Sequence, residues 1–319
     1  MEAQEVKKAY LQAPRLPPPT RTQVLTLGLA GLVLSPLYWM LACCRDVPGL
    51  AFRAQCFRLG LRLLPKLHGR IDAKTVFFLL CYPMDSTRYF EFDFAWRALA
   101  VPLSEKYLDV SSPRFFFTLL LLRHKNLTAD LLNPDKADLL ETDRLLGATG
   151  LRPRCRLHDT IIANTPLASA SFDVITSLSV VEHIPEDRQA IQKMWELLKP
   201  GGRLLLTVPC AARTSEQYID HDEYGVLGAG VDGYVFWQRF YDEALLRERI
   251  FSVTGEPCHA RIFGERTAGL FRKNSDRKWT ERYYPFWREP CMVGEEYTCF
   301  DSLNNLPGEG VIAMEFIKP

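Results

Sequence analysis

The stretch from Ser104 to Pro209 decides the fold, because five segments in it carry the pattern of buried strands. They read SEKYLDV (104–110), NLTAD (126–130), RLHD (156–159), SFDVITSLSVVEHI (171–184) and LLKPGGRLLLTVP (197–209). The first three end in or beside Asp109, Asp130 and Asp159. Because parallel strands of a doubly wound sheet end at one edge, these acids are expected to line a single crevice for a nucleoside-sized ligand. For any one acid, a simple cap on a helix or turn is the competing interpretation.

Around these acids, strand and helix patterns alternate. Strands are predicted at Lys106–Val110, Leu127–Asp130, Arg154–His158, Phe172–Leu178 and Gly202–Val208, and helices at Pro113–Arg123, Lys136–Gly147 and Glu186–Leu198. Ser112 is expected to cap the first of these helices. The segment TVFFLLCY (75–82) has the pattern of a strand, and a helix is expected from Thr87. The order predicts an α/β fold with a doubly wound, Rossmann-like parallel sheet.

The carboxyl-terminal part is expected to complete this sheet. FYDEALLRERI (240–250) has a helical pattern, and HARIFGE (259–265) and GVIAMEFIKP (310–319) are apolar runs that can pair as an antiparallel hairpin. The chain has 319 residues, of which 47% are hydrophobic, so one α/β domain with additions is expected.

Charge and cysteine content exclude several classes of function. Lys and Arg number 39 against 38 Asp and Glu, so no overall field attracts nucleic acid, and no nucleic-acid partner is expected. The nine cysteines form no C-x-x-C pair, which predicts reduced thiols, a cytosolic compartment and no metal site.

An apolar run near the amino terminus predicts a membrane segment. Val24 to Cys44 is 21 residues without a charge, about the length that crosses a bilayer. Pro36 is expected to kink or break this helix. Arginines such as Arg21 and Arg45 flank both ends, which favours a broken, re-entrant helix on the cytoplasmic side. A buried core helix is the alternative. The predicted organisation is a flexible lead-in (1–20), a membrane-associated helical segment (21–70) and an α/β domain (71–319).

The segment that follows is expected to lie at the membrane interface. Leu50 to Leu64 alternates apolar residues with Arg53, Arg58 and Arg62, which are expected to face headgroups; a solvated helix on the globular domain is equally compatible with the pattern. SPLYWMLACCRDVPGLAFRAQ (35–55) resembles the membrane segment of bacterial polyprenyl-phosphate hexose-1-phosphate transferases. The catalytic acidic pair of that family has no counterpart in LRLLPKLHGRIDAKT (61–75), so this resemblance implies an anchor and not a sugar-phosphate transferase.

The order of the α/β segments resembles the class I S-adenosylmethionine-dependent methyltransferases over about 200 residues. YLDVSSPR matches the first motif, TADLLNPD the second, LHDTIIANTPLASASFDVITSLSVVEHI the adenine-side acid with the following strand, and LLKPGGRLLLTVP the turn into strand five. The resemblance implies that S-adenosyl-L-methionine is the cofactor. It places Asp130 on the ribose, Asp159 near the adenine and Asp109 beneath the methionine end, with Ser177 also at the cofactor.

The first loop departs from that family. Ser111, Ser112, Pro113 and Arg114 stand where the family has glycines, which allow a close backbone approach and positive φ. Ser111 fits this loop if its φ stays negative. The hydroxyls of Ser111 and Ser112, or the guanidinium of Arg114, are expected to hold the cofactor's carboxylate.

Acceptor-side residues are expected after strands four and five. Glu182 and His183 follow the fourth strand, and His183 is a candidate base, with an exposed helix start as the alternative. His221, in the loop after strand five, is a third catalytic candidate, with a solvated lid as the alternative. Arg88 and Glu91 are expected near the methionine end or in packing.

Together these features predict a membrane-associated methyltransferase at the cytoplasmic face. Its acceptor is expected to be a small molecule, a glycan or a lipid-linked intermediate of cell-envelope polysaccharide biosynthesis. The alternative is a catalytically inactive methyltransferase-fold scaffold in a membrane complex.

Overall fold

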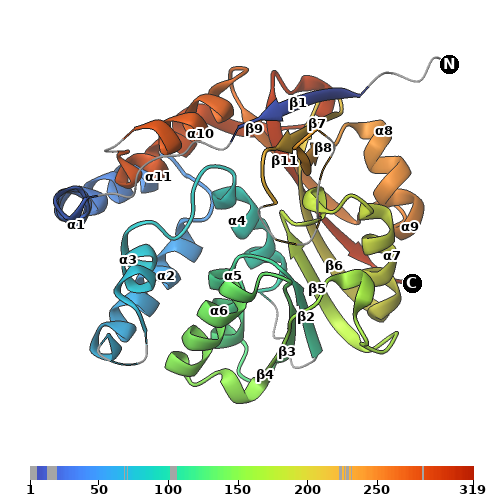
Figure 1. Cartoon of the computed structure of the whole chain (residues 1–319), viewed down its shortest axis with the longest axis horizontal. Coiled ribbons are helices and arrows are strands. Elements are labelled where there is room, and N and C mark those ends of the chain that lie inside the picture. Colours follow the sequence, from blue (N-terminus) through green and yellow to red (C-terminus); the bar gives the residue numbers. More distant parts are fainter. Residues whose placement is uncertain are drawn as a thin grey trace.

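The structure is a computed structural model that describes residues 6–12, 20–67, 69, 71–100, 106–222, 225, 227, 230, 232–281 and 284–319. An eight-stranded sheet with the order β10-β9-β11-β6-β5-β2-β3-β4 forms its centre (Figure 1). The strands β2 (Lys106–Val110), β3 (Thr128–Leu132), β4 (Cys155–His158), β5 (Phe172–Leu178) and β6 (Leu198–Ala211) pair in parallel. The predicted Rossmann-like sheet is therefore confirmed.

The other three strands complete one edge of the sheet. β9 (His259–Glu265) and β11 (Glu309–Ile317) pair antiparallel as predicted, and β10 (Tyr297–Phe300) extends the edge beside β9. β11 also pairs antiparallel with β6, so the carboxyl terminus closes onto the parallel part.

Two apolar cores cover the two faces of the sheet. Alternate residues of β2 face opposite sides: Tyr107 packs with Phe117, and Leu108 with the core that contains Ile191. Figure 1 shows α4 (Arg88–Ala98), α5 (Arg114–Arg123) and α6 (Lys136–Thr149) on one face, and α7 (Asp187–Leu197), α8 (Glu243–Leu246) and α9 (Ser252–Thr254) on the other. Since the chain winds in opposite directions from β2 and β5, a crevice is expected at their carboxyl ends.

Two local predictions are wrong. TVFFLLCY belongs to a helix, α3 (Ala73–Cys81), because the Asp72 carboxylate caps it by accepting from the Thr75 amide at 2.7 Å, and the residues it buries recur at helical spacing. Ser112 does not cap α5: its hydroxyl oxygen accepts a hydrogen bond from the Leu178 amide at 3.1 Å, and Pro113 is the N-cap.

The amino-terminal helices pack beside the α/β core. α1 (Arg21–Cys43) is one uninterrupted helix that contains Pro36, so the predicted break is wrong. The helix packs on α11 (Glu289–Glu296). α2 (Leu50–Leu63) starts at Gly49, whose φ of 76° and close approach to the Tyr89 carbonyl require glycine.

Arg53 on α2 was predicted to face lipid headgroups, and this prediction is wrong. It is buried, and its guanidinium donates to the Tyr89 hydroxyl and the Cys81 carbonyl, each at 3.1 Å. Arg58 and Arg62 are exposed.

A second, three-stranded sheet lies next to the central one and has no counterpart in the sequence-based prediction. β1 (Lys7–Leu11) pairs in parallel with β7 (Ser215–Ile219), which pairs antiparallel with β8 (Val235–Phe240). The amino-terminal strand therefore pairs with a segment more than 200 residues further along the chain.

Candidate active site

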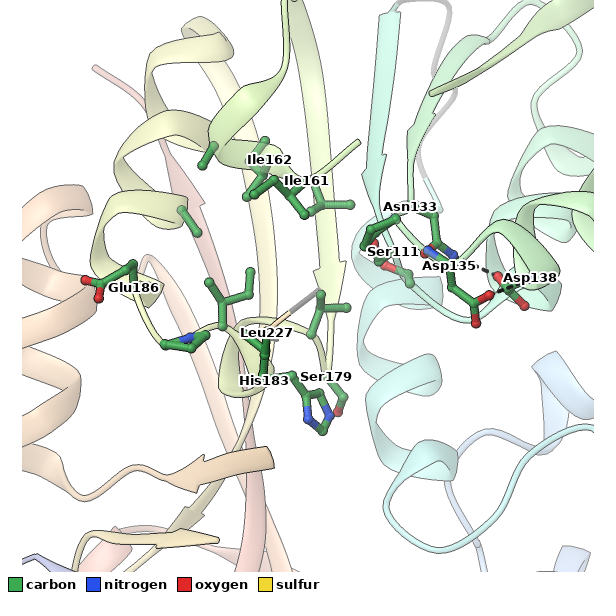
Figure 2. A pocket seen from close by; sticks show the side chains of 18 of the residues that line it. Ser111, Asn133, Asp135, Asp138, Ile161, Ile162, Ser179, His183, Glu186 and Leu227 are labelled. Carbon is green, nitrogen blue, oxygen red and sulfur yellow. Dashed lines mark hydrogen bonds between the residues drawn. The ribbon is translucent and has the colours of Figure 1, made fainter. Parts of the chain in front are cut away.

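A cavity of about 520 Å³ opens at the carboxyl ends of β2, β3 and β5. Figure 2 shows Ser111, Asn133 and Asp135 on one side and Ser179 and His183 on the other. We call the first side the acidic wall, because Asp135 and Asp138 belong to it; the second is the histidine wall, which also includes Arg88 and Leu227. The volume lies within the range of about 300–1,000 Å³ typical of small-molecule sites.

The loop after β2 contains a left-handed backbone conformation, which glycine adopts most easily. Ser111 has a φ of 54°, so the condition that its φ stay negative is not met. Its amide and its hydroxyl both donate to the Leu132 carbonyl, each at 2.9 Å, which compensates the left-handed backbone. Ser111, Ser112 and Pro113 all line the cavity.

Asp109 stabilises this loop from beneath and does not line the cavity. It is fully buried and accepts hydrogen bonds from the Tyr107 hydroxyl (2.7 Å), the Thr176 hydroxyl (2.8 Å) and the Ser112 amide (2.8 Å). Burial raises its pKa to about 6, while these donors act in the opposite direction. Asp109 therefore positions the loop and is shielded from any bound cofactor.

The acidic wall contains polar groups that the sequence-based prediction missed. Asn133 follows β3 directly, and its side-chain amide donates to Asp138 at 2.9 Å. Asp135 caps α6 by accepting from the amides of Ala137 (2.8 Å) and Asp138 (3.1 Å). These residues were part of the quoted segment TADLLNPD; its NPD triplet, which begins a helix directly after the strand, was the signal for them.

Asp130 does not reach the cavity. It is the third of five residues in β3, it is buried, and its carboxylate contacts His158 Nε2 at 2.6 Å. Asn133, which directly follows the strand, lines the cavity, whereas the acid within the strand does not. Beyond this strand the cavity is lined by Asn133, Asp135 and Asp138, and Asp130 is not part of its surface.

Three further cofactor predictions disagree with the geometry, since none of these side chains lines the cavity. Arg114 pairs with Asp138 at 3.2 Å and with Glu141, so its guanidinium is neutralised by α6. Asp159 is exposed and pairs with Lys136 at 3.3 Å. Ser177 is fully buried inside β5.

His183 lines the cavity, as predicted, in a defined tautomer. Its Nδ1 lies 2.7 Å from the Trp237 carbonyl oxygen of β8, so Nδ1 carries the proton and Nε2 the lone pair. Burial lowers the pKa of His183 to about 4, so the ring is neutral at physiological pH.

Glu182 lies behind His183 and does not line the cavity. It is 2% exposed, and burial raises its pKa to about 8. Glu91 is nearby and buried; its Oε2 accepts from Ser179 (2.6 Å), Thr207 (2.9 Å) and Arg88 (3.1 Å). The carboxylate of Glu91 thus positions Arg88 and Ser179, two residues of the histidine wall.

His221 lies apart from this site. Its side chain is 48% exposed, its Nδ1 contacts Asp220 at 3.1 Å, and it does not line the cavity. Leu227, from the same connection between β7 and β8, does line it. Among the residues that the structure describes, no cluster of three or more His, Cys, Asp or Glu side chains could hold a metal.

Comparison with known proteins shows that part of this chain is similar to methyltransferases. A family model described as a methyltransferase domain matches residues 117–206. A probable S-adenosylmethionine-dependent methyltransferase of Mycolicibacterium smegmatis is 33% identical over 57 residues, which are 18% of this chain and 22% of that protein. An arsenite methyltransferase of Aquipseudomonas alcaligenes is 33% identical over 91 residues, 28% of this chain and 25% of that one.

The matched segments span about a quarter of the length of these curated relatives. Among solved structures, the MccD protein is similar in fold, with a TM-score of 0.50 and 10% identity over 74% of this chain and 100% of that chain. These matches assign the sheet to the Rossmann-like methyltransferase fold.

Proposed function

We propose that this protein transfers a methyl group from S-adenosylmethionine to a small-molecule, glycan or lipid-linked acceptor at the cytoplasmic face of a membrane. The observation that carries the proposal is the cavity at the carboxyl ends of β2 and β5, with an acidic wall and a histidine wall on opposite sides. The switch point of a doubly wound sheet is where such folds bind nucleotides.

The residues of the acidic wall fit the nucleoside part of the cofactor. The carboxylates of Asp135 and Asp138 lie after β3, where they can accept hydrogen bonds from the two ribose hydroxyls. Ile161 and Ile162 line the same cavity and offer apolar surface to an adenine ring. Arg88 provides donors for the amino-acid end, and Ser179 Oγ, which donates its hydrogen to Glu91, offers an acceptor there.

When bound, S-adenosylmethionine supplies an electrophilic methyl group on a sulfonium. The chain's own contribution is then alignment, exclusion of water and placement of one proton acceptor. His183 Nε2 carries the lone pair on the histidine wall, and a pKa of about 4 makes it a hydrogen-bond acceptor that orients a hydroxyl rather than a strong base. This favours an acceptor that needs little deprotonation before attack.

The membrane part of the proposal is supported by α1. Leu25–Cys43 is long and apolar enough for a membrane span, by length and composition, and only 17% of it is buried. The resemblance of residues 35–55 to the anchor of polyprenyl-phosphate sugar transferases suggests envelope polysaccharide work, by analogy alone.

A scaffold that has lost catalysis is the second candidate, favoured by the serine and proline side chains that occupy the loop after β2. Incubation of the protein with methyl-labelled S-adenosylmethionine and an envelope lipid and glycan fraction tests the proposal. We expect label in that fraction with wild type and with His221→Ala, and a loss of at least about tenfold with His183→Ala. Wild type that transfers no label to any fraction would support the scaffold.

A further inference from the structure

α1 presents a continuous apolar face to the outside. Seven large apolar side chains are exposed along it, at intervals of one to four residues that keep them on one side of the helix. They are Leu25, Leu29, Leu32, Val33, Leu37, Met40 and Leu41. Val33 is 74% exposed and Leu25 66%. A contiguous exposed face of this size indicates a surface that a partner or a membrane covers.

The opposite face of α1 is attached to the domain along its length. A Cβ on Gly31 would lie 2.6 Å from the ring of Phe286, so glycine permits this contact. Further along, the Cys291 thiol donates to the Tyr38 carbonyl at 3.2 Å, and Ala42 is fully buried. Only one face of the helix is therefore available to lipid, which is the arrangement of an interfacial helix and not of a lipid-surrounded span.

The chain on both sides of α1 belongs to the same globular body. Before it, β1 pairs with β7 over five residues; after it, α2 packs on α3 and α4. A helix that crosses a bilayer would leave these two segments on opposite sides. Because both pack on one domain, α1 must begin and end on the same side of any membrane. The helix is also unbroken at Pro36, which excludes the re-entrant turn.

The charges next to α1 identify the kind of surface. Between Leu50 and Cys81 the sequence has six Lys and Arg and a single acid, Asp72. Arg58 and Arg62 are exposed on α2, and Trp39 of α1 packs edge-on against Phe57 of α2 at 5.7 Å. Figure 1 shows α1, α2 and α3 on the same side of the molecule. Basic residues beside an apolar helix face complement anionic headgroups.

We infer that α1 docks in the plane of an anionic lipid surface, with its exposed apolar face in the headgroup region and the exposed Arg58 and Arg62 of α2 on the headgroups. This inference rests on the membrane association in the proposed function and specifies its geometry. In this geometry α1 does not cross the bilayer.

Flotation of the purified full-length protein with vesicles tests the docking. We expect flotation with vesicles of phosphatidylcholine mixed with phosphatidylglycerol, and weaker flotation with phosphatidylcholine alone. The double variant Leu29→Glu/Val33→Glu is expected to lower vesicle binding at least about tenfold. Leu140→Glu, at a leucine that is 52% exposed on α6, is the matched control and should float like wild type.

A protease-sensitive tag at the amino terminus tests the in-plane geometry. With vesicle-bound protein, external protease should remove the tag completely, because β1 stays on the domain side. Protection of the tag would overturn the inference in favour of a span. If wild type does not float and is a dimer, and Leu29→Glu/Val33→Glu is a monomer, the apolar face binds a second copy of the chain. That result would also overturn the inference.

Titration of S-adenosylhomocysteine into the same variants separates this inference from the proposed function. Both variants should bind it like wild type, since α1 is outside the cavity, and this binding also shows that they are folded. Failure of all proteins to bind would contradict the proposed function without affecting the docking result.

Discussion

Ser111 is held in a backbone conformation that most side chains avoid, and the site depends on it. Its φ of 54° is accessible to serine because the hydroxyl bonds back to the Leu132 carbonyl. A β-branched residue is strongly disfavoured there.

We therefore expect Ser111→Val to lower the free energy of unfolding by about 2 kcal/mol and to weaken S-adenosylhomocysteine binding, whereas Ser111→Gly keeps both. Denaturant unfolding and calorimetry measure the two effects. Ser252→Val is the control, since Ser252 is exposed and has an ordinary φ of −62°. If Ser111→Val and Ser252→Val lose the same unfolding free energy, the left-handed backbone at Ser111 is not the cause of the loss.

The buried carboxyl of Glu182 makes stability depend on pH. Burial raises its pKa from 4.5 to about 8, so the folded protein holds a proton that the unfolded chain releases between these values. The contribution of the protonated Glu182 carboxyl to the unfolding free energy is complete below pH 4.5 and is lost as pH rises through about 8.

Relative to wild type, Glu182→Gln should therefore gain about 2 kcal/mol of unfolding free energy between about pH 6 and pH 8. Thermal unfolding of both proteins across this range measures the difference. Asp109, whose pKa is raised to about 6, titrates in both proteins and cancels. If the stabilities of wild type and Glu182→Gln change in parallel with pH, Glu182 is ionised in the folded state across this range, and the prediction is wrong.

At the residue scale, the sequence predicted which loops form the cavity better than which acidic side chains line it. His183, Ser111 and Ser112 line the cavity as expected, because their loops follow strands whose ends are clear in the pattern. Asp130 and Asp109 do not, because a strand alternates its side chains between two faces and the sequence does not show which acid is satisfied internally by His158 or Tyr107.

At the element scale, β8 connects the second sheet to the histidine wall. The Arg239 guanidinium on β8 contacts the Asp187 carboxylate at 2.5 Å and the Pro185 carbonyl at 3.3 Å, and it is 7% exposed. Asp187 is fully buried and also pairs with Arg249 at 3.1 Å. These contacts fix the strand that holds the His183 ring through the Trp237 carbonyl.

Arg239→Met is expected to cost about 3 kcal/mol of unfolding free energy and to increase hydrogen exchange in β7 and β8. Arg249→Met is the matched control, because it removes a second partner of Asp187 that is 31% exposed and not on β8. It should cost less and leave exchange in β8 unchanged. If both variants exchange alike in β8, Arg239 does not anchor the second sheet.

The elements that sequence reasoning missed are those fixed by distant contacts. The five parallel strands and their helices were predictable, since each carries its own pattern of apolar residues. β1 was not, because its partner β7 lies more than 200 residues away. α3 looked like a strand because its run of apolar residues is too short to distinguish the two periods.

At the scale of the whole molecule, the second sheet connects α1, the helix proposed to dock on lipid, to the cavity. Nine residues separate Leu11 at the end of β1 from Arg21 at the start of α1, a distance of at most about 35 Å when fully extended. A docked α1 would therefore keep the sheet that carries Trp237 close to the lipid surface. This arrangement suits an acceptor that is itself at the membrane.

We propose that the cavity at the carboxyl ends of β2, β3 and β5 holds the adenosyl cofactor against Asp135. Calorimetric titration of S-adenosylhomocysteine into wild type, Asp135→Asn and Asp130→Asn tests it most directly. We predict binding by wild type and Asp130→Asn with similar affinity, and binding at least about tenfold weaker by Asp135→Asn, because a charge-assisted hydrogen bond to ribose is lost. No binding by wild type, or a loss confined to Asp130→Asn, would contradict the account.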